Sequence, residues 1–62
     1  MDEKESITNG YAATIENIYK VFFQEFTMAH GDPDTENAAK ERFRKGILHA
    51  RHVRDLALEL LP

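Results

Sequence analysis

Apolar residues between Tyr11 and Ala29 recur at the spacing of an α-helix. They occupy positions 11, 12, 15, 18, 19, 22, 23, 26 and 29. Steps of three and four residues place such side chains along one face of a helix with about 3.6 residues per turn. No glycine or proline interrupts the segment. The pattern therefore predicts a first helix over about residues 10–30.

The stretch "AHGDPDTE", residues 29–36, carries the signals of a helix end followed by a helix start. Gly31 suits the left-handed position just after a helix, Asp32 suits an N-cap, and Pro33 suits the first helical residue. We expect a tight turn at 31–32 and a second helix over about 33–61. Its apolar face would comprise Ala39, Phe43, Gly46, Ile47, Ala50, Val53, Ala57, Leu58 and Leu61.

A connection of about two residues requires the two helices to lie antiparallel. The predicted fold is a single all-α domain over 1–62, an antiparallel two-helix hairpin preceded by a flexible acidic arm, residues 1–9. Ser6 or Thr8 could cap a first helix that starts earlier. Facing residues should have numbers that sum to about 65: Phe26 with Ala39, Phe22 with Phe43, Tyr19 with Gly46, Ile15 with Ala50, and Ala12 with Val53. Gly46 would then make room for Tyr19.

More apolar residues are present than one hairpin seam can cover. The apolar arc of the second helix spans roughly 200°, and the first helix has apolar residues at its margins. The predicted interface comprises Val21, Phe23, Met28, Val53, Leu56, Leu60 and Leu61. Three occupants are open: the N-terminal arm, a second copy that completes a four-helix bundle, or a heteromeric protein partner. The homodimer is the preferred prediction.

Size and composition support association. A chain of 62 residues buries only about 60% of the surface that its unfolded form exposes. The chain has no cysteine, so neither a disulfide nor a thiolate metal site can stabilise it. Oligomerisation or very regular helix packing would have to do so instead.

Arg54 is the one charged residue that falls within the apolar arc of the second helix. By the facing rule it meets Tyr11, which offers a ring face or a hydroxyl. The simpler interpretation is an edge arginine with a buried stem and a solvated head. The sharper hypothesis adds Arg54 to the predicted interface, where it would fix the register of a dimer through a carboxylate of the other copy.

Charge is distributed unevenly, which raises nucleic-acid binding as an alternative. The net charge is −3, yet the acids concentrate in residues 1–36 and the bases in residues 40–54. Lysine and arginine contact phosphates with little regard to sequence. The candidate residues are Arg42, Arg44, Lys45 and Arg51. They do not form one flat face on a helical wheel, and two of them can pair with acids at i,i+4, Lys45 with Glu41 and Arg51 with Asp55.

The stretch "GILHARHVRD", residues 46–55, sets His49 and His52 one helical turn apart. Histidines at this spacing can point to the same side and ligate a metal in a helical bundle. Two ligands do not complete a site, and the neighbouring Arg51 and Arg54 would repel a cation. A metal-binding bundle through these two histidines is the second alternative, and we expect no cofactor.

The sequence does not indicate an enzyme. It contains no nucleophile beside a base, no glycine-rich phosphate loop and no converging pair of carboxylates. No apolar run approaches the roughly 20 residues of a membrane span, and the acidic N-terminus does not resemble a signal peptide. We therefore expect a cytoplasmic, non-enzymatic interaction or regulatory module that acts through its helix surfaces.

Overall fold

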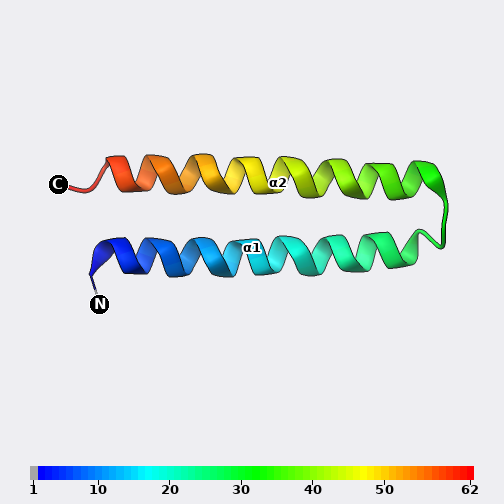
Figure 1. The fold of residues 1–62 in the computed structure, drawn as a ribbon, viewed down its shortest axis with the longest axis horizontal. Coiled ribbons are helices and arrows are strands. Elements are labelled where there is room, and N and C mark those ends of the chain that lie inside the picture. Colours follow the sequence, from blue (N-terminus) through cyan, green and yellow to red (C-terminus); the bar gives the residue numbers. More distant parts are fainter. Residues whose placement is uncertain (1) are drawn as a thin grey trace.

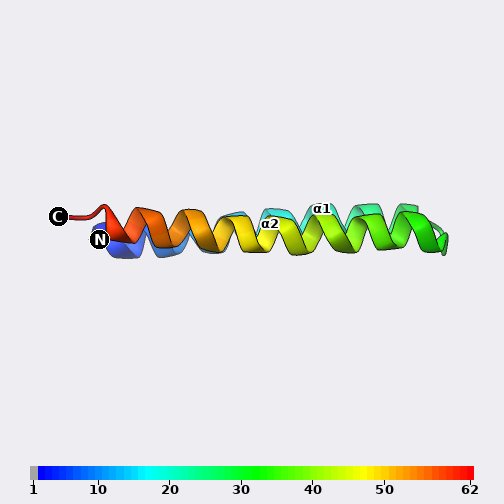
Figure 2. The same ribbon diagram turned by 90° about the horizontal axis from the view of Figure 1, so that it is seen from above.

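Two long antiparallel helices make up the whole fold of the computed structural model, which describes residues 2–62. Helix α1 spans Glu3–Met28 and helix α2 spans Pro33–Glu59. They lie side by side along their full lengths, and the two views show a single flat layer with both termini at one end (Figures 1 and 2). The Cα atoms extend over 48 × 18 × 6 Å. The predicted all-α hairpin is confirmed, and residues 2–62 contain no strand.

Helix α1 starts at Glu3, about seven residues earlier than predicted. Residues 3–9 are helical, so the expected flexible arm is wrong for them; Met1 lies outside the described residues. The N-cap is Asp2, not Ser6 or Thr8, and its carboxylate accepts a hydrogen bond from the Glu5 amide at 2.8 Å. Acidic residues in the first turn also interact favourably with the positive end of the helix dipole.

The turn is longer than predicted because α1 ends two residues early. His30 and Gly31 both have positive φ, 51° and 81°, which reverses the chain between Met28 and Pro33. Asp32 is the N-cap of α2, as predicted, and its carboxylate accepts hydrogen bonds from the Thr35 amide at 2.9 Å and the Thr35 hydroxyl at 2.6 Å. Pro33 is the first residue of α2. The sequence therefore correctly predicted both the left-handed conformation at Gly31 and the start of α2 at Pro33.

The register of the hairpin follows the predicted sum. The Phe22 and Phe43 rings lie 4.8 Å apart, and the guanidinium of Arg54 lies 4.4 Å from the centre of the Tyr11 ring. One predicted pair is wrong: Gly46 faces Ile18, not Tyr19. A Cβ at Gly46 would meet the Ile18 side chain at 3.4 Å, an ordinary contact, while Tyr19 is 55% exposed.

The core between the helices is thin. The buried residues within 2–62 are all alanines, Ala29, Ala39 and Ala50, and no large side chain is fully buried. The radius of gyration is 14.6 Å, whereas a compact chain of this length would have about 11 Å. The accessible surface is 4897 Å², against about 4,100 Å² for a folded monomer of this mass. One hairpin seam is too narrow to enclose the apolar side chains that the sequence supplies.

The stability that the Asp32 cap gives to the turn depends on pH. Hydrogen bonds from Thr35 lower the pKa of the Asp32 carboxyl below its ordinary value of 3.8. A lowered native-state pKa stabilises the fold above the unfolded-state value and ceases to do so as pH falls through the native value. We expect Asp32→Ala to lower the melting temperature at pH 7, and the difference from the unmutated protein to shrink below pH 3.8. Circular dichroism melts across this range measure it.

Asp2→Ala is the matched control for this prediction, because it removes the corresponding cap from the free end of α1. Loss of that cap should fray one terminal turn and leave the hairpin connection intact. Equal destabilisation by the two substitutions would contradict a special role for the Asp32 turn.

Candidate interaction surface

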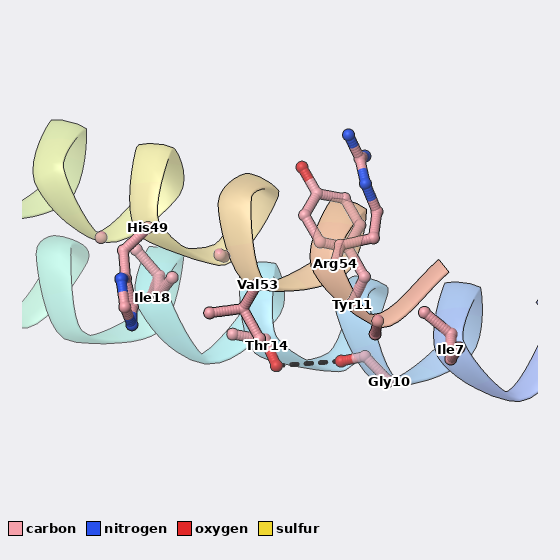
Figure 3. Close-up of a pocket in the computed structure, with 11 residues that line it drawn as sticks. Ile7, Gly10, Tyr11, Thr14, Ile18, His49, Val53 and Arg54 are labelled. Carbon is pink, nitrogen blue, oxygen red and sulfur yellow. Dashed lines mark hydrogen bonds between the residues drawn. The ribbon is translucent and has the colours of Figure 1, made fainter. Parts of the chain in front are cut away.

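A shallow groove runs along one face of the hairpin. The groove consists of two hollows, of about 500 Å³ and 270 Å³. Ile18 and Gly46 line both of them, so the hollows are adjacent along the seam. Figure 3 shows the larger hollow, with Thr14, Ile18, His49 and Val53 along it. We call this side the groove face. Its edges carry Gly10, Thr14 and Val21 from α1 and Gly46, His49 and Val53 from α2.

The middle of the groove face carries little charge. The Thr14 hydroxyl donates a hydrogen bond to the backbone carbonyl oxygen of Gly10 in the same helix, at 2.9 Å (Figure 3). Near the turn, Arg42 of α2 forms a salt bridge with Glu25 of α1, in which Nε donates to Oε2 at 2.6 Å. Glu25 therefore pairs with Arg42 across the two helices.

Two cations lie over aromatic rings of α1. The Lys40 ammonium is 5.8 Å from the centre of the Phe26 ring, and the Arg54 guanidinium is 4.4 Å from that of Tyr11. Arg54 also donates to the carboxylate of its neighbour Asp55 at 3.0 Å. Tyr11 and Arg54 extend to the same side at one end of the groove (Figure 3). The predicted contact of Arg54 with Tyr11 is confirmed. The guanidinium of Arg54 is also already paired with a carboxylate of its own chain, that of Asp55.

Most of the predicted interface residues are exposed. Met28 is 74% and Leu60 82% exposed, and Val21, Phe23, Val53 and Leu56 are also open to solvent, whereas Leu61 and Arg54 are half-buried. Val21 and Val53 line the groove. Met28 follows Val21 by seven residues, and Leu56 and Leu60 follow Val53 by three and seven, so these side chains lie on the groove side as well.

Phe23 does not belong with that set. Its ring lies 6.3 Å from the ring of Tyr19, and at 100° per residue both fall on the flank of α1 opposite to Val21. Tyr19 and Leu48 are exposed apolar residues that the sequence reasoning missed. Tyr19 was assigned to the hairpin seam because it falls within the apolar arc, and a one-residue shift toward Ile18 moved it to the edge.

The four candidate phosphate-binding cations are not gathered into one surface. Arg42 is paired with Glu25 on the groove side. Arg44 is paired with Glu41 at 3.0 Å, and the hydrogen bond between them lowers the pKa of Glu41 and raises that of Arg44. Lys45 and Arg51 are exposed and form no ion pair with any residue in 2–62.

His49 and His52 are both exposed, and only His49 lines the groove. Across residues 2–62, no three histidine or carboxylate side chains are grouped so that they could hold a metal ion. Neither helix has the combination of length and apolar composition that crossing a membrane requires.

Comparison of the chain with models of known protein families, with curated proteins and with solved structures finds no match in any of the three.

Arg54 offers a measurable contribution within the hairpin. Arg54→Gln keeps a polar side chain and removes the cation over Tyr11, so the free energy of unfolding should fall by about 0.5–1 kcal/mol. In a Tyr11→Leu background the same substitution should have a smaller effect, because the ring that the cation contacts is gone. Urea unfolding of the four proteins measures this coupling. Equal effects in both backgrounds would mean that the stacking adds nothing to stability.

Proposed function

We propose that this protein is a small, non-enzymatic interaction module that self-associates through its helix surfaces, two hairpins forming a four-helix bundle. The observation that carries this proposal is the missing core. Among residues 2–62, nothing larger than an alanine is buried, and eight large apolar side chains are substantially exposed. Apolar surface of this extent in a water-facing chain marks an interaction site.

The exposed area matches what a dimer would bury. A compact protein of twice this chain's mass would expose about 6,800 Å². Two separate copies expose twice the 4897 Å² of one chain. Pairing them into a compact unit would bury about 3,000 Å² in total, which lies in the range of obligate homodimers, about 2,000–5,000 Å².

Two features favour a protein partner over nucleic acid. The chain is acidic overall, with a net charge of −3, and phosphate binding depends on uncompensated cations. Of the four candidate cations, Arg42 and Arg44 are already engaged by Glu25 and Glu41. A heteromeric partner would use the same exposed residues as a second copy, so the stoichiometry of the purified protein separates those two cases.

Sedimentation equilibrium of the purified chain tests the proposal. We expect a mass of two chains down to micromolar or lower concentration, because obligate homodimers, whose subunits stay paired, have large apolar interfaces of this kind. The mass should be the same at low and physiological salt, because apolar burial drives the association and salt screening leaves it unaffected. A monomer at all concentrations would contradict self-association and point to a different partner for these side chains.

A further inference from the structure

We infer that the second copy docks on the groove face, with the turns of the two hairpins at the same end of the bundle. This inference rests on the proposed self-association and specifies its surface and geometry. Each copy would lay the exposed apolar residues of its groove face over the glycines of the other.

The first observation that favours a partner helix at the groove is the glycine at position 10. It lies inside α1, where glycine costs about 1 kcal/mol relative to alanine. A Cβ at this position would meet nothing within 4 Å, whereas a Cβ at Gly46 would touch Ile18. Nothing in the chain therefore requires a glycine at position 10. A helix of another molecule that approaches the groove closely would require it, because helices packed at short distance need small residues at the contact.

The groove face is complementary to itself. Along α1, small Gly10 comes first and large Val21 and Met28 come later; along α2, small Gly46 comes first and large Leu56 and Leu60 come later. The helices are antiparallel, so a large residue of one helix lies level with a small residue of the other at two places along the groove: Leu56 with Gly10 near the free ends, and Val21 with Gly46 nearer the middle. A copy turned over about the long axis places its α1 on this chain's α2. Val21 then meets the partner copy's glycine at 46, and Leu56 meets the glycine at 10.

The level of these pairs agrees with the register seen within one chain. The contacts between α1 and α2 join residues whose numbers sum to between 64 and 67, as in Ile18 with Gly46 and Glu25 with Arg42. Val21 with Gly46 and Leu56 with Gly10 fall within the same range. Residues that contact each other within one hairpin and residues that would contact each other between two hairpins are therefore matched at the same height along the helix axes.

Charge decides which way the second copy points. The Glu25–Arg42 ion pair lies at the turn end of the groove. With the turns at opposite ends, the leucines at the other end of the partner would cover this pair and remove it from water, at a cost that pairing alone does not recover. With the turns together, the two ion pairs share one end of the bundle, and the leucines of both copies lie at the other end over the apolar part of the partner's α1. Apolar surface then meets apolar surface.

The opposite flank is less suited to a second copy. At 100° per residue, Lys40, Arg44 and Arg51 lie along α2 on the side of Tyr19 and Phe23. Two copies docked by this flank would bring these cations close together in a desolvated contact, where like charges repel strongly. On the groove side of α2 the corresponding cations are Arg42, which is already paired with Glu25, and Lys45, which lies on the outer margin of the helix.

Gly10→Leu tests the surface. The added side chain would fill the space assigned to the partner, so we expect the dimer dissociation constant to rise at least tenfold in sedimentation equilibrium. At concentrations where the variant is still dimeric, its helix content should equal or exceed that of the unmutated dimer, because leucine is a better helix former than glycine and a Cβ at position 10 meets nothing within 4 Å. Loss of affinity would therefore not reflect misfolding.

Ala13→Leu is the matched control. Ala13 is exposed on the same helix, almost one turn further on, and at 100° per residue it lies on the outer side of α1, away from the groove. It should leave the dissociation constant within about twofold. If the unmutated protein is a dimer and Gly10→Leu binds as tightly as Ala13→Leu, the groove-face inference is wrong while self-association stands. If the unmutated protein is a monomer, the proposed function itself fails.

Labels at the turn test the orientation. The chain has no cysteine, so Asn37→Cys provides a unique site for a spin label near the turn, on an exposed part of α2. With the turns together, the two labels should lie within about 30 Å of one another, because packed helices are 8–10 Å apart. With the turns at opposite ends, the labelled positions would be roughly 40 Å apart along the bundle, because each lies about 12 residues from the middle of the hairpin at 1.5 Å per residue, and that result would overturn the proposed geometry.

Discussion

A hairpin of two helices has only one seam, and this geometric constraint governs the rest of the structure. Each helix can bury a stripe against the other, but the sides of that stripe stay open to water. Close approach along the seam selects small residues, so alanines are buried while the larger side chains stand at the edges. The apolar residues that would form the core of a larger protein are therefore at the surface of this one.

The turn fixes the register of the two helices, and the register decides which residues lie side by side on the exposed faces of the hairpin. His30 and Gly31 reverse the chain, and Asp32 and Pro33 start α2 at once, so the helices are held at a fixed axial offset. The aromatic contact between Phe22 and Phe43 lies at the level that this offset dictates. Along the groove this offset sets the glycine of each helix level with a large apolar residue of the other, and the proposed self-association depends on this arrangement.

Much of the fold could be predicted from local signals, and the misses have physical causes. Apolar spacing marked both helices, and the "GDP" signal placed the turn. The early start of α1 was missed because residues 3–9 contain a single apolar residue, Ile7. There, the cap at Asp2 and the acidic first turn stabilise the helix, while periodicity contributes little. The spacing of Asp2 and Glu5 is the capping pattern that could have revealed it.

The surface was harder to predict than the fold. The exposed residues Val21, Met28, Leu56 and Leu60 followed from an apolar arc that was too wide for one partner. Which flank each residue occupies depends on the register to within one residue, and the facing rule lacked that precision at Tyr19. The cross-helix ion pair of Glu25 with Arg42 was missed for the same reason, since which cation faces Glu25 depends on the register to within one or two residues.

The central claim is that the hairpin completes its core only by association, and the concentration dependence of thermal unfolding tests it most directly. If folding and association are coupled, mass action requires the melting temperature to rise steadily as protein concentration increases. We predict such a rise across a hundredfold range of concentration, followed by circular dichroism. A sharp unfolding transition with a melting temperature independent of concentration would contradict the claim, because it would show that a single hairpin is stable on its own.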